Sequence, residues 1–96
     1  MNIVGKTIKV KIDGMYNILG RGWILFVCDD RLSNTIVPYG STVTVDGKVF
    51  TIIGTERAAY GEGWFSPSMG IRLRPNDHVK ECFREGQEIE IEIKER

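Results

Sequence analysis

A two-residue alternation of apolar and polar side chains runs through most of this chain and limits the folds open to it. It is clearest in Glu88–Lys94, where isoleucines alternate with charged residues. The same period recurs in Lys6–Asp13, Thr42–Val45 and Ile71–Arg74. Such alternation is typical of strands that bury one face. We therefore expect an all-β protein.

Short turn signals separate the expected strands. Asp46-Gly47 stands between Ser41–Val45 and Lys48–Ile53, and this dipeptide is a strong signal for a two-residue hairpin. Trp23–Cys28 is apolar on both faces, unlike the alternating segments. This pattern predicts a strand that is central in its sheet or covered on both sides.

The expected elements fit a small barrel. A single helical turn is predicted near residues 76–83, with Asn76 or Asp77 as N-cap and Gly86 just beyond its end. Six or seven short strands with one such turn favour a closed barrel of Greek-key-like order, because closure removes exposed sheet edges. A chain of 96 residues is expected to form one domain, residues 1–96.

Composition and charge narrow the function classes. The net charge is zero, so the overall charge does not indicate a nucleic-acid-binding protein. Cys28 lies inside the apolar run and is expected in the core, whereas Cys82 is expected to be partly exposed; two cysteines form neither a disulfide framework nor a zinc site. The longest apolar run, Trp23–Cys28, is too short for a membrane span or an export signal. We expect a cytoplasmic protein that does not enter a membrane.

Residues suited to catalysis or metal binding are few. His78 is the single histidine, and no cluster of cysteines or carboxylates stands around it at ligand spacing. It is interpreted as a solvated residue of the helical turn. Asp29-Asp30 at a strand end is interpreted as turn polarity rather than as an acid–base pair. We expect no enzymatic activity, no metal and no cofactor.

A few side chains are prominent without being required by the fold. Trp64 and Phe65 lie between glycines and a Ser-Pro-Ser segment, where they either cover a barrel mouth or form a recognition patch. Arg72 and Arg74 are expected on the outer face of their strand, and Arg57 follows a strand end. Guanidinium groups beside aromatic rings suit phosphate contact and base stacking, although solvated strand faces have the same pattern.

Five segments carry a family resemblance in their order and spacing between about Ile8 and Ile93. They are ILGRGWILFV, YGSTVTVDG, FTIIGTER, MGIRLRPND and FREGQEIEI. Together they resemble the second domain of elongation factor Tu and its relatives among the translational GTPases. That resemblance implies a six-stranded barrel of the translation-factor type, here standing alone without a GTPase domain.

The resemblance also implies a binding role. In elongation factor Tu the barrel abuts the GTPase domain and receives the aminoacylated end of tRNA. The matching positions here are Arg21 and Gly22 in the Gly-Arg-Gly turn, Glu56 in a Gly-x-Glu corner, and the strand Ile71–Leu73.

The expected function is that of a non-enzymatic binding module for an RNA end or a ribosome- or translation-associated surface. The rival is a protein–protein interaction or regulatory module, for example one borne by a phage or mobile element. Zero net charge favours the rival, and the family resemblance favours the first. The expected binding residues are Arg21, Gly22, Glu56, Arg57, Trp64, Phe65, Ile71, Arg72 and Leu73.

Overall fold

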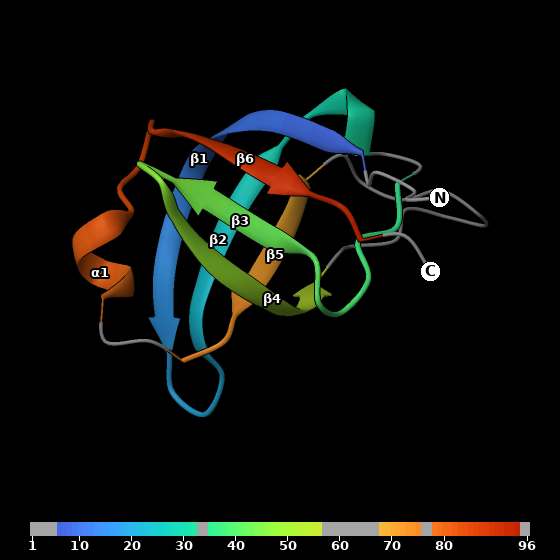
Figure 1. Ribbon diagram of the computed structural model, residues 1–96. Coiled ribbons are helices and arrows are strands. Elements are labelled where there is room, and N and C mark those ends of the chain that lie inside the picture. Colours follow the sequence, from blue (N-terminus) through green and yellow to red (C-terminus); the bar gives the residue numbers. More distant parts are fainter. Residues whose placement is uncertain (1–5, 33–34, 57–67, 76–77, 95–96) are drawn as a thin grey trace.

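The computed structural model describes residues 6–32, 35–56, 68–75 and 78–94 (Figure 1). The elements in chain order are β1 (Thr7–Ile18), β2 (Gly22–Cys28), the 3₁₀ helix η1 (Asp30–Leu32), β3 (Thr42–Val45), β4 (Lys48–Glu56), β5 (Ser68–Leu73), α1 (Val79–Cys82) and β6 (Glu88–Glu92).

The six strands close into a barrel in the order β1-β2-β5-β4-β3-β6, with every neighbouring pair antiparallel. The prediction of a small closed all-β barrel is confirmed. The hairpin β3–β4 is inserted between β5 and β6, and β6 returns to lie between β1 and β3. The apolar segment Trp23–Cys28, predicted to be central or covered on both sides, forms β2 between β1 and β5, and its adjacent residues Ile24 and Leu25 are both fully buried.

Two long strands form the corners of the barrel. β1 pairs with β6 over Thr7–Lys11 and with β2 from Ile12 to Ile18, and a register shift lies between Ile12 and Gly14. β4 changes partner in the same way, from β3 to β5, with a shift between Ile52 and Gly54. A bulge bends a strand and increases its twist, which lets one strand serve two sides of a closed barrel.

The alternation seen in the sequence sorts side chains between the barrel interior and its outside. Along β1, Ile8, Val10 and Ile12 are buried and the residues between them are exposed. Every strand contributes buried apolar side chains to one core cluster. The fully enclosed members include Leu25, Val27, Val43, Ile52, Met69, Ile71, Leu73, Ile89 and Ile91.

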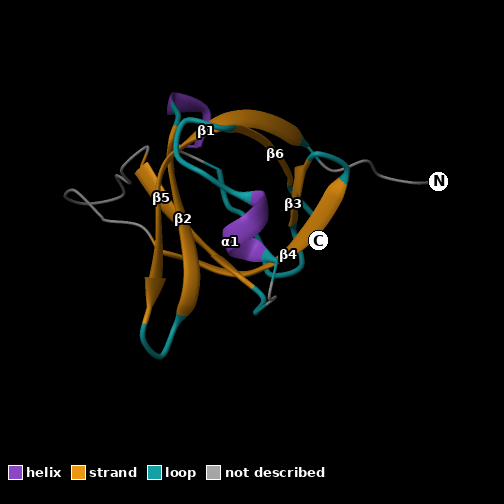
Figure 2. Ribbon diagram, turned by 90° about the vertical axis from the view of Figure 1, so that its left-hand side faces the viewer, coloured by secondary structure: helices purple, strands orange, loops and turns teal. Residues whose placement is uncertain are grey.

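A short helix covers one end of the barrel. Figure 2 looks toward this end, with α1 in front of the barrel interior. Val79 is fully buried, and the Phe83 ring meets Phe50 edge to face at 4.8 Å between ring centroids. The predicted helical turn is thus present but shorter than expected. Its N-cap is His78 rather than Asn76 or Asp77, and the two predicted residues lie outside the described part of the chain.

The tight turn predicted at Asp46-Gly47 is confirmed. Val45 pairs with Lys48, and φ is 48° at Asp46 and 78° at Gly47. Two consecutive positive φ values match the two-residue hairpin turns whose twist suits antiparallel strands. Gly86 likewise has a positive φ, of 81°, after the helix.

Two expectations about β1 and β2 were wrong. The first strand does not end near Asp13 but continues to Ile18, because residues 12–18 pair with β2. Cys28 is exposed, not part of the core. It stands at the end of β2 opposite Ser68, on the outward side of the strand together with Phe26, and little structure covers it there. Cys82 is partly buried, as expected.

Candidate functional site

The outside of the barrel has two chemically different halves. Across β6, β1 and β3 the outward side chains are charged or hydroxylated and paired by register, with Lys9 opposite Glu90 and Lys11 opposite Glu88. Thr44 lies opposite Glu90 on the other side. Cross-strand pairs of opposite charge are typical of a solvated sheet face.

The second half, formed by β1, β2, β5 and β4, is mostly apolar. We call it the outer apolar face. Its members occupy two adjacent cross-strand rows, Gly14–Phe26–Gly70–Glu56 and Tyr16–Ile24–Arg72–Gly54. Neighbouring strands are about 4.8 Å apart, so each row places four side-chain positions within roughly 15 Å. Ile24 is 0% exposed although it faces outward.

Glycines leave room on this face for large neighbouring side chains. A Cβ at Gly70 would lie 3.0 Å from the Phe26 ring and 3.1 Å from Ile24. A Cβ at Gly14 would lie 3.1 Å from the ring of Tyr16. The two aromatic rings therefore lie against backbone rather than projecting freely. They also meet each other edge to face, with 5.5 Å between their centroids.

Arg72 is the cation at the centre of the outer apolar face. It lies between Ile24 and Gly54 in its row, and its Nη1 is 3.8 Å from the position of a Cβ at Gly54. Its Nε is buried, and this nitrogen has no hydrogen-bond partner within the described residues. A buried Nε–H donor without an acceptor is costly, because a hydrogen bond does not repay its desolvation.

An ion pair stands beside this face. Nη1 of Arg21 lies 2.7 Å from Oε2 of Glu56, and the two side chains are 55% and 32% exposed. The pair links the β1–β2 turn to the end of β4. Gly22, next to Arg21, has a φ of 83° that opens this turn. The structure thus brings together Arg21, Gly22 and Glu56, three residues that the family resemblance singled out.

The other predicted site residues separate into two groups. Ile71 and Leu73 are fully buried members of the core cluster, so they can act on a ligand only by supporting β5. Arg57, Trp64 and Phe65 lie outside the described residues. Tyr16 and Phe26, by contrast, were not predicted as site residues. The apolar run through β2 indicated that both faces of this strand are covered. Only the full length of β1 shows that Tyr16 lies beside β2 on the outer face.

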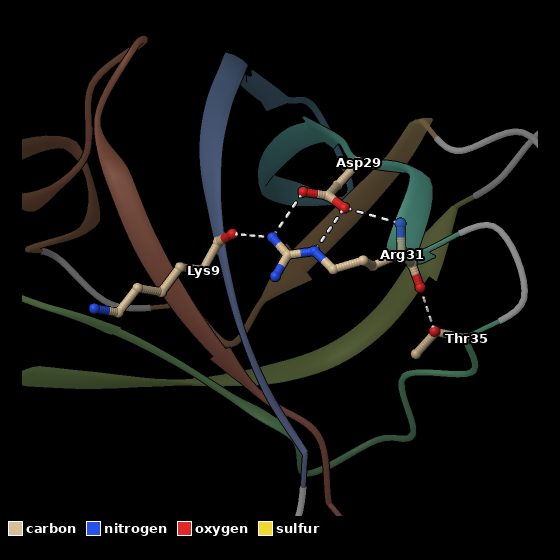
Figure 3. A network of polar contacts seen from close by, with 4 residues as sticks. All are labelled: Lys9, Asp29, Arg31 and Thr35. Atoms are coloured by element: carbon tan, nitrogen blue, oxygen red, sulfur yellow. Dashed lines mark hydrogen bonds and ion pairs between the residues drawn. The ribbon is translucent and has the colours of Figure 1, made fainter.

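A polar network connects η1 to β1 near the end of β2 at Cys28, away from the β1–β2 turn (Figure 3). The Asp29 carboxylate accepts hydrogen bonds from the backbone N–H of Arg31 at 2.8 Å and from its Nε at 2.9 Å. Nη2 of Arg31 also donates to the carbonyl of Lys9 at 2.6 Å. These hydrogen bonds lower the pKa of Asp29 to about 2. The expected turn role of this aspartate is what the geometry supports.

The network has a structural purpose. β2 ends at Cys28, so near Lys9 the strand β1 is paired with β6 on one side and has no paired strand on the other. Arg31 supplies the missing donor to the carbonyl of Lys9. The carbonyl thus has a hydrogen-bond partner although no strand is paired with β1 on that side. We call this network, formed by Asp29 and Arg31 on the Lys9 carbonyl, the edge cap.

A hollow of about 350 Å³ lies beside α1 and is lined by Lys48, Val49, Phe50 and His78. Nζ of Lys48 lies 3.8 Å from the Cys82 sulfur, and His78 contacts Glu81 at 3.3 Å. Within residues 6–32, 35–56, 68–75 and 78–94, no three His, Cys, Asp or Glu side chains are grouped to hold a metal. In the same residues no helix has the length and apolar character needed to cross a membrane.

Comparison of the chain with known protein families, with curated proteins and with solved structures finds no match. The architecture defines the class: a small closed six-stranded antiparallel barrel with one apolar outer half. A barrel of this kind does not determine what it binds, so any function depends on the residues at its surface.

Proposed function

We propose that the protein is a non-enzymatic binding module that holds single-stranded RNA on its outer apolar face. Its setting would be cytoplasmic and translation-associated, as the resemblance to the second domain of elongation factor Tu implies. The observation that carries the proposal is Arg72, a half-buried guanidinium whose Nε has no partner among the described residues. A phosphate or a base edge is an acceptor that would repay its desolvation.

The neighbours of Arg72 suit the rest of a nucleotide. Tyr16 and Phe26 provide aromatic rings in the two rows of the outer apolar face, and Tyr16 is 55% exposed. Proteins that bind single strands combine cationic groups with rings on which bases stack. Gly54 lets a ligand approach the backbone beside Arg72.

Arg21 supplies a second cation at the rim. Its ion pair with Glu56 is exposed, and exposed pairs contribute little to stability. Arg21 can therefore exchange the carboxylate for a phosphate at small cost. Among the described residues the face therefore has one cation at its centre, Arg72, and a second at its rim, Arg21 in the β1–β2 turn.

The test is fluorescence anisotropy with a mixed-sequence single-stranded RNA of about 10 nucleotides, over a range of salt concentrations. Arg72→Ala should weaken binding and reduce the slope of log K against log salt by about one unit. Tyr16→Ala should weaken binding by about 1–3 kcal/mol without changing the slope. Lys11→Ala is the matched control, because it removes the same charge from the other half of the barrel.

The outcomes separate cleanly. Wild type without affinity at low salt overturns the RNA proposal. Binding that responds to Lys11→Ala as strongly as to Arg72→Ala means that RNA contacts the barrel elsewhere, and it overturns the assigned face. Far-UV circular dichroism of each variant is needed to show that it is folded.

A second candidate, docking onto another protein, is favoured by the β1–β2 turn. Leu19 at its tip is 101% exposed, and the net charge of the chain is zero. Exposed apolar groups without excess charge suit protein surfaces better than phosphates. Binding to a protein would depend far less on salt than binding to RNA, so the same titration distinguishes the two.

A further inference from the structure

Within the described part of the chain, one edge of the β1–β2 hairpin has no strand paired with it. β1 pairs with β6 only over Thr7–Lys11, and residues 12–18 pair with β2 on one side alone. Apart from this pairing and the turn hydrogen bond from the Arg21 N–H to the Ile18 carbonyl, the described residues form no backbone hydrogen bond with Gly14–Ile18. Alternate residues of a strand direct their N–H and C=O groups to each side. The segment Gly14–Ile18 therefore presents donors and acceptors outward.

Two of the usual protections against pairing, charge and proline, are missing from this edge. Charged side chains, prolines and short length normally protect an edge strand. The stretch Gly14–Gly20 contains no charge and no proline, whereas the β1 residues Lys9 and Lys11 lie where the strand is paired with β6. Ile18 and Leu19 are also exposed apolar side chains beside this edge.

We propose that the occupant of this edge is a second copy of the same chain. Antiparallel pairing of Gly14–Ile18 with itself places Tyr16 opposite Tyr16, Met15 opposite Asn17 and Gly14 opposite Ile18. This arrangement is closed and two-fold, since the same residues meet on both sides. The zero net charge of the chain means that two copies do not repel each other.

The dimer extends the outer sheet across the two-fold axis. The strands would run β5-β2-β1 in one copy and β1-β2-β5 in the other. Both tyrosines at position 16 then lie at the centre of one continuous face, together with the exposed side chain of Ile18 from each copy. An interface of five residue pairs belongs to the small, weak class, so it is expected only at high protein concentration.

The experiment is sedimentation equilibrium of the full chain from about 10 µM to about 1 mM, without RNA. The wild-type mass should rise toward twice that of one chain. In Tyr16→Lys two like charges face each other across the axis, and this variant should remain at the mass of one chain. Tyr16→Glu should behave in the same way for the same reason.

Mixing the two variants is the decisive measurement. An equimolar mixture of Tyr16→Lys and Tyr16→Glu should regain the double mass, because lysine then faces glutamate. Val49→Lys, a charge placed on another exposed apolar strand residue, should leave the wild-type behaviour intact. Circular dichroism confirms that each variant is folded.

Three results overturn the inference. They are a wild type of single-chain mass throughout the range, a mixture that does not associate, and a Val49→Lys variant that dissociates. Because RNA is absent, failure here leaves the RNA proposal standing. The RNA proposal fails only in the anisotropy measurement.

Discussion

Gly70 shows how closely the outer apolar face is packed at the level of one residue. It is buried, and a Cβ there would lie 3.0 Å from the Phe26 ring and 3.1 Å from Ile24. Ile24 is fully enclosed and cannot retreat easily. Overpacking of this kind typically costs about 1–3 kcal/mol.

We therefore expect Gly70→Ala to lower the free energy of unfolding by about 1–3 kcal/mol in urea titration. Gly54→Ala is the control on the next strand, because its Cβ would meet Arg72 at an ordinary 3.8 Å. That variant should match or slightly exceed wild type, since alanine restricts the unfolded chain more than glycine does. Equal effects of the two substitutions would contradict the packing described for Phe26.

Arg72 allows binding and stability to be separated. Methionine has an unbranched apolar side chain and no buried Nε that needs an acceptor. Arg72→Met should leave the thermal midpoint unchanged or raise it, while RNA affinity falls. A large loss of stability would mean that the guanidinium is needed for the fold. That result would contradict the proposal that its buried Nε is kept for a ligand.

Among the elements, the β3–β4 hairpin depends on one turn. Gly47 has a φ of 78°, a conformation that β-branched residues rarely adopt. We expect Gly47→Val to destabilise the protein by roughly 1–3 kcal/mol through backbone strain, as measured by urea unfolding. Gly47→Asn should cost less, because asparagine tolerates this region. A valine variant as stable as wild type would be inconsistent with the turn.

The edge cap at η1 predicts a dependence of stability on pH. The pKa of Asp29 lies at about 2 in the folded protein, because Arg31 donates hydrogen bonds to the carboxylate. The unfolded value is near 3.9. The stabilisation is therefore fully present above about pH 4 and is lost as the pH falls toward 2.

The measurement compares wild type with Asp29→Asn in urea at several pH values. Wild type should be the more stable above about pH 4, and the difference should shrink as Asp29 becomes protonated. A difference that stays constant down to about pH 2 would show that the carboxylate charge is not what stabilises the cap.

For the whole molecule, local patterns predicted the class of fold, and long-range pairing decided the rest. The alternation and Asp46-Gly47 were sufficient for an all-β barrel with a hairpin. The length of β1 was not predictable, because the alternation stops at Asp13 and only the pairing of residues 12–18 with β2 continues the strand. Cys28 was wrongly predicted to be buried, because an apolar run does not show at which residue the strand becomes exposed.

The candidate site was predictable only in part. Arg21 and Glu56 are 35 residues apart, and a family resemblance alone suggested them as one site. The rows that place Tyr16, Phe26 and Arg72 on one face follow from strand order. Periodicity within each segment does not show that order, because the order depends on pairing between strands far apart in the chain.

Sharing of β1 and β4 between two sides of the barrel predicts cooperative unfolding. Neither half of the barrel can detach without breaking a strand that belongs to both. Tryptophan fluorescence and far-UV circular dichroism should therefore give coincident urea transitions. Two separate midpoints would show that the two halves unfold independently.

The position of β6 has a consequence for how the protein is made. Thr7 pairs with Glu92, so β1 cannot complete its pairing until β6, which lies far downstream in the sequence, has been synthesised. Contacts so distant in sequence slow folding, because the chain must close a long loop before they form. During synthesis on a ribosome the hairpins β1–β2 and β3–β4 can form early. Ring closure must wait until β6 has emerged, and until then both β1 and β3 offer open edges to neighbouring nascent chains.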